Sequence, residues 1–415
     1  MRRPLVLVVA SLALLALTCH SGSGQLTADE REAVVGDAPA DPGPLAVLSG
    51  EAESRSIQVA MRKVADWQAR SVADSPSQDW TFATLYVGML SASETLHEPR
   101  YRDLVTGVAE HYHWTLGPRK ANADDQAIGQ AYLWLDQRKP DAQHLEPMRS
   151  QFAEIMQAPD DPAKPVWWWC DALFMAPPVW SGLAATTRDS QYLEYMHHQW
   201  QVTSDLLWDR QEHLYFRDNS YFDKRERNGK KVFWSRGNGW VMGGLVRVLE
   251  SLPASDPRRP FYVRRLQAMA QSVARIQGAD GLWRPGLLDA GDYPYPEVSG
   301  SALFVYAIAW GLNHHLLDEK EFEPVVRRGW AGLVAHIYAD GRLGCVQPVG
   351  AAPGAYTAGA SYVFGTGAFL LAGSEVNRWA ILQSGMSGGS RRFSSRRLHR
   401  LDLEGVANVA ANVEP

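Results

Sequence analysis

Apolar residues recur at helical spacing along most of the chain between residues 50 and 378. Few runs show the strict alternation that predicts a strand, and clusters of Pro and Gly separate the periodic stretches. The pattern predicts twelve helices, which cover residues 52–72, 80–96, 99–115, 125–137, 142–157, 171–187, 189–208, 239–251, 259–277, 298–316, 321–338 and 356–377.

Twelve consecutive helices of similar length form six helical hairpins, and each hairpin has to bury its apolar faces against neighbours on both sides. This favours an all-α fold, an (α/α)6 barrel in which six hairpins close into a toroid. An open solenoid would also bury these faces, but it would show a repeated sequence motif, and we find none.

The even-numbered helices are the more apolar member of each pair, for example the stretches from Trp80, Asp171 and Ser361. Helices that are apolar nearly all round are buried, so we expect these to form the inner ring. All inner helices then run in one direction, and their N-terminal ends meet at one face.

Carboxylates, aromatic residues, an Arg and an Asn gather at the start of these inner helices. They are Asp79, Trp80, Asn122, Asp124, Asp125, Trp167, Trp168, Trp169, Asp171, Trp234, Arg236, Trp240, Tyr293, Tyr295, Glu297, Tyr356 and Tyr362. An Asp at a helix start is commonly an N-cap, which would explain each acid alone. Capping does not explain the tryptophans and Arg236 at the same level, and the joint pattern favours a binding site.

The composition supports a sugar ligand for this site. Sixteen of the 415 residues are Trp, whose flat face covers the C–H faces of sugars, although a large core could also absorb them. The net charge of −5 gives no reason to expect a nucleic-acid partner. No spacing of His and Cys predicts a metal site, and we expect no metal and no cofactor. Cys170 is interpreted as a buried filler and not as a nucleophile.

Two carboxylates in one site suit acid catalysis, provided that one of them keeps its proton near neutral pH. Burial among Trp167, Trp168 and Trp169 and the charge of Asp124 or Asp125 would raise the pKa of Asp171, while a helix N-terminus would lower it. Arg236 is suited to bind a substrate carboxylate with two parallel hydrogen bonds, which favours a uronic acid as substrate.

The two ends of the chain differ from its centre. Arg2 and Arg3 precede an apolar run from Leu5 to Leu17, which predicts a signal peptide over residues 1–25 and export to the periplasm or medium. Cys19 could alternatively carry a lipid anchor, and we expect the protein to associate with a membrane only if Cys19 is lipidated. Residues 26–49 are interpreted as a linker, 50–378 as the catalytic domain and 379–415 as a disordered tail.

Several of these segments resemble glycoside hydrolase family 105, the unsaturated rhamnogalacturonyl hydrolases, which are related to the unsaturated glucuronyl hydrolases of family 88. The resemblance covers roughly residues 50–378. The matching segments are 169–178 (WCDALFMAPP), 233–240 (FWSRGNGW), 122–126 (NADDQ) with Gly129, 297–301 (EVSGS) and 365–373 (GTGAFLLAG).

The resemblance implies an (α/α)6 barrel and oligosaccharide substrates with a 4,5-unsaturated uronic acid at the non-reducing end, such as the lyase products of rhamnogalacturonan and pectin. It implies that Asp171 protonates C4 of the double bond and that water adds at C5, with help from Asp124 or Asp125. Arg236, Trp169 and Trp240 would hold the sugar, and Trp80 is a weaker candidate.

Some members of the family carry a His on the segment before the Arg motif, where this chain has Arg217 and Asp218. Either residue could take its place, and Arg217 is counted as a substrate-binding candidate. Two alternatives remain open from the sequence: a conventional glycosidase or polysaccharide lyase on the same toroid, and an exported glycan-binding protein without activity.

Overall fold

The computed structural model describes residues 36–158, 161 and 164–387. The predicted signal peptide and residues 388–415 of the predicted tail lie outside these ranges. Export, and the choice between release and a lipid on Cys19, therefore stay predictions. Residues 379–387, which were expected to belong to the tail, continue the last helix instead.

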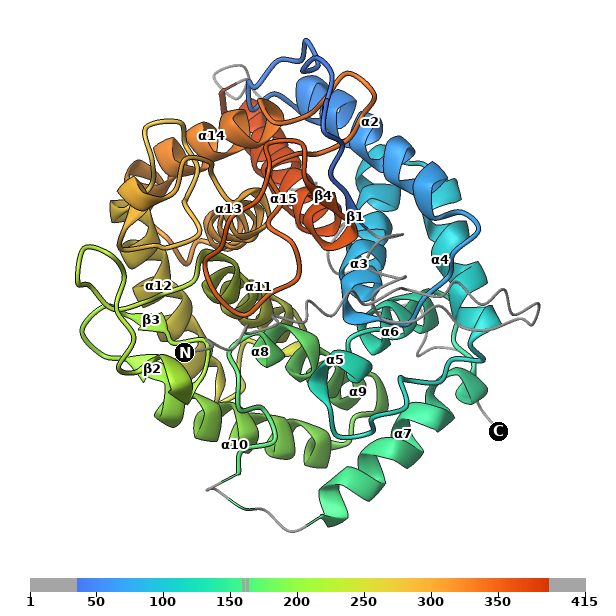
Figure 1. Ribbon diagram of the computed structural model, residues 1–415. Coiled ribbons are helices and arrows are strands. Elements are labelled where there is room, and N and C mark those ends of the chain that lie inside the picture. The colour runs from blue at the N-terminus through green and yellow to red at the C-terminus, as the bar shows by residue number, and fades with distance from the viewer. Residues whose placement is uncertain (1–35, 159–160, 162–163, 388–415) are drawn as a thin grey trace, which may run out of the picture.

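Twelve long helices of the described chain alternate between an outer and an inner ring (Figure 1). The outer ring contains α2 (Ser54–Val72), α4 (Pro99–His111), α7 (Ala142–Gln157), α10 (Ser190–Leu207), α12 (Arg259–Arg275) and α14 (Glu319–Val334). The inner ring contains α3 (Trp80–Leu96), α6 (Gly129–Arg138), α9 (Pro177–Thr187), α11 (Ser235–Ser251), α13 (Val298–Asn313) and α15 (Val363–Ser387). Each inner helix contacts the next, and α15 contacts α3, which closes the ring. The predicted (α/α)6 barrel is confirmed.

The sequence of each helix accounts for its ring. Outer helices are amphipathic: α2 buries Ile57, Met61 and Val64 and turns its polar residues to solvent. The inner helix α13 is buried from Val298 to Leu312, because apolar residues cover its whole circumference. No helix of the described residues is long and apolar enough to cross a membrane.

Two inner helices are preceded by a separate short turn at the rim. These turns are α5 (Ala123–Gln126) and α8 (Ala172–Met175), where the sequence pattern predicted a single helix from 125 and from 171. Pro177 and Pro178 explain the second break, because proline has no N–H to continue α8 but fits the first turn of a new helix. The breaks place Asp124 and Asp171 in short elements above the long helices.

Helices α3 and α15 approach so closely that only glycine fits between them. A Cβ atom on Gly367 would lie 2.3 Å from the carbonyl oxygen of Thr84, and one on Gly88 would lie 2.4 Å from the carbonyl oxygen of Gly367. This contact joins the last inner helix to the first and so completes the toroid.

The strands are only two residues long and belong to the segments before and between the helices. Strand β1 (Gly36–Asp37) pairs antiparallel with β4 (Ser361–Tyr362), and β2 (Trp208–Asp209) pairs with β3 (Leu214–Tyr215). Two single-turn 3-10 helices follow, η1 (Asn219–Tyr221) and η2 (Ala290–Asp292).

Much of the segment that was expected to be a linker is attached to the toroid. Beyond β1, the N–H of Ala46 donates to the carbonyl of Ile337 over 2.8 Å, and the N–H of Ala339 donates to the carbonyl of Pro44 over 2.9 Å. Residues 36–49 therefore lie along the domain instead of only leading to it.

Candidate active site

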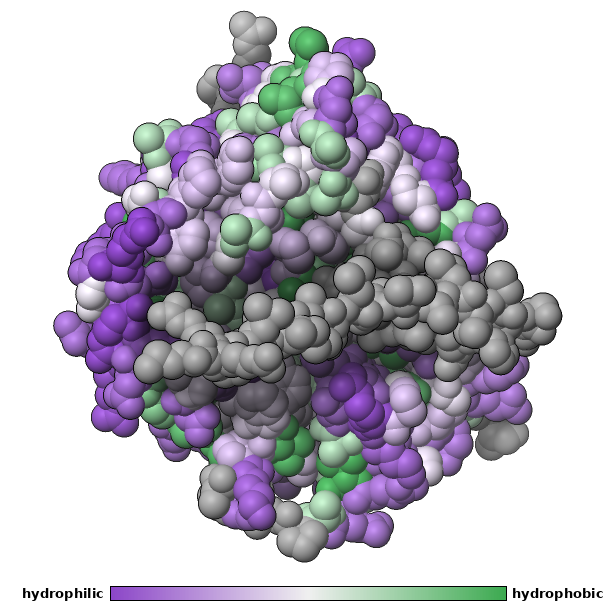
Figure 2. Space-filling view, in the orientation of Figure 1, coloured by the Kyte–Doolittle hydropathy of each residue, from purple (hydrophilic) through white to green (hydrophobic). Residues whose placement is uncertain are grey.

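The N-terminal ends of the inner helices bring the predicted site residues to one face of the toroid. Trp80 begins α3, Asp124 lies in α5, Asp171 immediately precedes α8, and Arg236 lies in the first turn of α11. The toroid is viewed along its axis in Figure 1, and Figure 2 shows the same face with hydrophilic residues gathered around its periphery.

Asp171 is not a helix cap. Its backbone is already helical (φ −62°, ψ −30°), and its carboxylate accepts no hydrogen bond from the first turn of α8. By contrast, Asp141, Asp189 and Asp318 do cap the outer helices α7, α10 and α14. The capping alternative therefore fails for Asp171, and its carboxylate is left available for chemistry.

Cys170 and Gly237 enclose the Asp171 carboxylate on one side. The thiol of Cys170 donates to Oδ1 of Asp171 over 3.2 Å. A Cβ atom on Gly237 would lie 3.0 Å from that sulfur and 3.3 Å from the same carboxylate oxygen. Glycine at position 237 therefore lets α11 pack closely against Cys170 and Asp171. Cys170 is fully buried, and burial raises the pKa of its thiol well above the ordinary value, which supports its interpretation as a filler.

Asp171 and Asp124 both hold a proton more tightly than an ordinary Asp. Burial raises the pKa of Asp171, against the opposing effects of Arg217, the Cys170 thiol and Arg236. Burial, and next the charge of Asp171, raise the pKa of Asp124 to about 7. Two neighbouring carboxyl groups with raised pKa values can share the tasks of acid and base near neutral pH.

The structure separates the two adjacent aspartates that the sequence left as alternatives. Asp125 is buried and binds Arg119, whose backbone N–H donates to Oδ2 over 2.7 Å and whose Nε donates to Oδ1 over 3.0 Å. The N–H of Asp124 is capped by Asn122, and its carboxylate is the one that interacts with Asp171. Asp125 thus holds the loop at 117–119, and Asp124 is the partner of Asp171.

Arg217 lies directly beside the acid. Its carbonyl accepts a hydrogen bond from the N–H of Cys170 over 2.8 Å, which ties the segment after β3 to the residue before Asp171. Its guanidinium pairs with Asp218 over 2.6 Å and lies 5.2 Å from the ring centre of Trp168. The Arg217 side chain keeps 18% of its surface exposed, so a ligand can reach it.

Arg236 and Trp240 are enclosed. Two nitrogens of Arg236 donate to the carbonyls of Gln347 and Pro348, and its side chain has no exposed surface. Trp240 is fully buried, and its ring meets Trp80 edge-on at 5.9 Å. A sugar would reach Arg236 only if the 347–348 segment moved, and the roles assigned to Arg236 and Trp240 by resemblance stay predictions.

The three consecutive tryptophans have different environments. Trp167 and Trp169 are 1% and 6% exposed, whereas Trp168 is 48% exposed and offers its ring to solvent beside Arg217. Trp169, the predicted sugar-binding residue, is thus mostly buried. Trp168, which the sequence placed at this face only as a residue that would help to bury Asp171, has the exposed ring. No periodicity could have distinguished them, because they lie in a loop before α8.

The described residues contain neither a disulfide nor a group suited to bind a metal ion. Cys170 and Cys345 are both free. Within the described ranges, no group of three or more His, Cys, Asp or Glu is arranged to hold a metal ion.

The family model and the similar proteins all point to glycoside hydrolases. The model of Glycosyl Hydrolase Family 88 matches residues 53–380. An "Unsaturated 3S-rhamnoglycuronyl hydrolase" from Formosa agariphila is 38% identical over 77% of this chain and 90% of its own length. A protein of the same name from an Alteromonas species (strain LOR) is 33% identical over 72% of this chain and 78% of its own.

Solved structures agree with this family. A "Glycosyl hydrolase family 88 from Bacteroides vulgatus" is 32% identical with a TM-score of 0.74, over 79% of this chain and 99% of its own. A structure described as a polysaccharide lyase is 33% identical with a TM-score of 0.75, over 80% of this chain and 98% of its own. The chain belongs to Glycosyl Hydrolase Family 88, and it is a hydrolase of oligosaccharides that carry an unsaturated uronic acid.

Proposed function

We propose that the substrate is an oligosaccharide in which the unsaturated uronic acid is linked to a 3-sulfated rhamnose. The names of the two relatives from Formosa and Alteromonas support this glycan. The single observation that carries the chemistry is the pair of neighbouring carboxyl groups with raised pKa values, Asp171 and Asp124. Rhamnogalacturonan and pectin fragments, expected from the sequence, become the comparison substrates.

In the proposed reaction, the protonated carboxyl of Asp171 transfers its proton to C4, and the C4–C5 π bond supplies the electron pair for the new C–H bond. Water adds to the cationic C5, and a carboxylate of the pair takes the proton that this water loses. The C5 hemiketal then opens: its C5–O bond to the ring oxygen breaks, C5 becomes a ketone, and the proton of the C5 hydroxyl passes to the ring oxygen. C1 is now a hemiacetal, which collapses to an aldehyde as the C1–O bond to the remaining sugar breaks, and the leaving oxygen takes up the hemiacetal proton. Asp124 and Asp171 repel each other when both are ionised, so one of the two carboxyl groups tends to keep a proton.

Arg217 is our candidate for the residue that binds the uronate. In the unsaturated sugar the carboxylate is attached to C5, so it lies next to C4 and must be close to Asp171 during protonation. The charge of Arg217 is the largest of the effects that lower the pKa of Asp171, and the Arg217 side chain is partly exposed. A guanidinium that interacts electrostatically with Asp171 can form charge-assisted hydrogen bonds to the carboxylate of the sugar.

The test of this function is the near-ultraviolet absorbance of the double bond, which disappears on hydration. We expect the absorbance to fall with unsaturated uronyl–rhamnose-3-sulfate, and to fall more slowly with the desulfated disaccharide and with rhamnogalacturonan digests. Equal rates on all three would refute the sulfated glycan, and no fall on any would refute the function.

A polysaccharide lyase remains the second candidate, because one similar solved structure carries that description. A lyase would create the double bond, so absorbance would rise when the protein is incubated with intact polysaccharide. A rise there without a fall on disaccharides would favour the lyase.

For Arg217→Gln we expect kcat/KM to fall about 10- to 100-fold, mainly through a higher KM, since a charge-assisted hydrogen bond contributes roughly 1.5–3 kcal/mol. Arg217→Lys should recover part of the loss. Arg102→Gln is the matched control, because Arg102 is an exposed Arg on the outer helix α4 whose one ion pair within the described part of the chain is with its neighbour Asp103. An unchanged KM in Arg217→Gln would rule out this role.

A further inference from the structure

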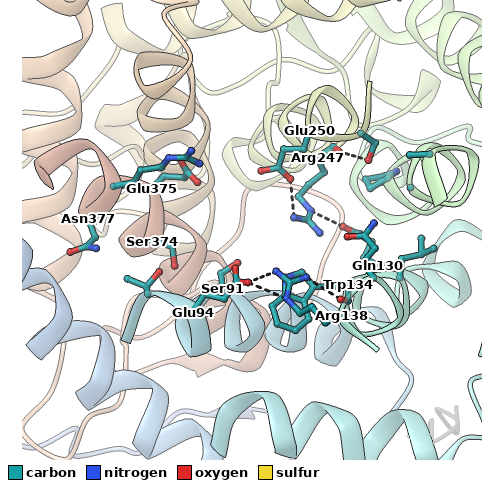
Figure 3. A pocket seen from close by; sticks show the side chains of 18 of the residues that line it. Ser91, Glu94, Gln130, Trp134, Arg138, Arg247, Glu250, Ser374, Glu375 and Asn377 are labelled. Atoms are coloured by element: carbon teal, nitrogen blue, oxygen red, sulfur yellow. Dashed lines mark hydrogen bonds and ion pairs between the residues drawn. The ribbon is translucent and has the colours of Figure 1, made fainter. Parts of the chain in front are cut away.

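A second cavity opens at the opposite mouth of the toroid. It has a volume of about 640 Å³ and is lined by residues of α3, α6, α9, α11 and α15, on α3 and α11 by the C-terminal turns (Figure 3). Because the inner helices run in parallel, this cavity lies at the end away from Asp171. Its volume falls within the range of about 300–1,000 Å³ that is typical of small-molecule sites.

The charges in this opposite-mouth pocket are nearly balanced. Arg138 pairs with Glu94, and Arg247 pairs with Glu250 over 2.9 Å and donates from Nε to Gln130 over 3.2 Å. Figure 3 shows these groups on one side of an open space and Ser374, Glu375 and Asn377 on the other. With Arg378, the lining carries three arginines and three glutamates, and burial raises the pKa of Glu375 to about 7. Near neutral pH the net charge of the lining therefore lies between zero and +1, and the net attraction for a charged ligand is small.

Unused hydrogen-bonding groups face this pocket. Asn377 lines the pocket, but its Oδ1 is fully covered and has no hydrogen-bond partner among the described residues, so a ligand reaches this oxygen only if the side chain turns. The exposed guanidinium of Arg378 donates no hydrogen bond to any described residue. Glu375 accepts from Asn313 over 2.7 Å through one oxygen only, and burial raises its pKa to about 7, so near neutral pH it can both donate and accept.

We propose that the opposite-mouth pocket is a second, non-catalytic binding site for a neutral saccharide. Each sugar hydroxyl both donates and accepts a hydrogen bond, which matches a lining that mixes donors with acceptors and carries little net charge. The ring of Trp134 is already covered by the guanidinium of Arg138 at 3.3 Å, so hydrogen bonds, and not ring stacking, hold the sugar.

Gln130 separates this pocket from the catalytic face. Its Nε2 donates to the carbonyl of Phe174 over 2.8 Å, and Phe174 belongs to α8, which follows Asp171. Gln130 therefore lies between the two sites, and binding in the opposite-mouth pocket does not require a substrate at Asp171.

The experiment uses the inactive Asp171→Asn protein with L-rhamnose and D-glucose as probes, and sodium D-glucuronate as the charged comparison. We expect saturation-transfer NMR to show binding of at least one neutral sugar. Ala185→Trp, which places a large ring on an exposed lining position of α9, should weaken that binding at least about tenfold, a loss of ~1.4 kcal/mol. Trp168→Ala, on the catalytic face, should leave it unchanged.

Three results would overturn the proposal: no binding of either neutral sugar, equal binding to the Ala185→Trp protein, or tighter binding of glucuronate in this pocket. Ala185→Trp in the otherwise native enzyme should keep kcat and KM on the unsaturated disaccharide, which separates this site from the proposed function. If Ala185→Trp does not fold by circular dichroism, Arg378→Ala, an exposed position, decides in its place, with the same loss expected.

Discussion

At the scale of single residues, Asp124 and Asp125 are adjacent and yet differ in role. For Asp124→Asn we expect kcat to fall roughly 100-fold or more, as for a group that handles protons. For Asp125→Asn we expect kcat to change little and the free energy of unfolding to fall by about 1–3 kcal/mol, because charge-assisted bonds to Arg119 weaken. Steady-state kinetics and urea unfolding of both variants test this, and the reverse pattern would contradict the assignment.

Asp124 also makes stability depend on pH. Its pKa is about 7 in the folded protein against an ordinary value of 3.8, so its stabilising contribution is complete below pH 3.8 and is lost as the pH rises through 7. A pKa raised from 3.8 to about 7 corresponds to at most ~4 kcal/mol, at about 1.4 kcal/mol per pKa unit. Asp124 is only partly buried, so solvent screens part of this energy, and we expect Asp124→Asn to raise the free energy of unfolding at pH 8 by roughly 1–3 kcal/mol.

At pH 4 the same substitution should change the free energy of unfolding much less, by about 0.6 kcal/mol, because the Asp124 carboxyl is then protonated in the folded protein and already about 40% protonated in the unfolded chain. Urea unfolding at the two pH values gives the comparison. An equal increase in the free energy of unfolding at pH 4 and pH 8 would show that burial does not disfavour the ionised form of Asp124.

At the scale of elements, one of the tightest helix contacts is the crossing of α3 and α15. Gly367→Ala would press a methyl group against the backbone of Thr84, and we expect a loss of about 3 kcal/mol or more in the free energy of unfolding. Gly107→Ala on α4 is the control, because nothing lies within 4 Å of its added Cβ. It should gain about 0.5–1 kcal/mol from helix propensity alone. Equal effects of the two changes would argue against the tight crossing.

The sequence predicted the helices well because burial in a toroid imposes a strong period. The inner helices are apolar on all sides and the outer ones on one face, and both patterns are visible without a structure. The break between α8 and α9 was missed although Pro177 and Pro178 mark it, because the apolar run continues across them. The docking of 36–49 could not be predicted, because it depends on backbone hydrogen bonds that any sequence can make.

The site was predicted in its location but less well in its contacts. Parallel inner helices require their N-termini to meet, which brought Asp124 and Asp171 together. The burial of Arg236 depends on the loop at 347–348, more than one hundred residues away, and no local signal reports it. The choice of Trp168 over Trp169 as the exposed ring depends likewise on loop conformation.

At the scale of the whole molecule, the segment 36–50 joins the N-terminal part of the chain to the loop after α14. The family match begins only at residue 53. We therefore expect a protein that starts at residue 51 to keep its helical circular dichroism and to lose about 1–3 kcal/mol in the free energy of unfolding, from the lost backbone hydrogen bonds. A protein that starts at residue 36 is the control, and equal stability of the two would show that the segment does not stabilise the toroid.

The uneven exposure of the tryptophans gives the protein an internal optical reporter. All sixteen lie in the described residues, and Trp168 is the only one that is largely open to solvent. Acrylamide should therefore quench the fluorescence of Trp168 far more than that of the other fifteen. A sugar that settles beside Arg217 would shield this ring, so substrate arrival at the catalytic face could be followed in real time without a label, even in the inactive Asp171→Asn protein.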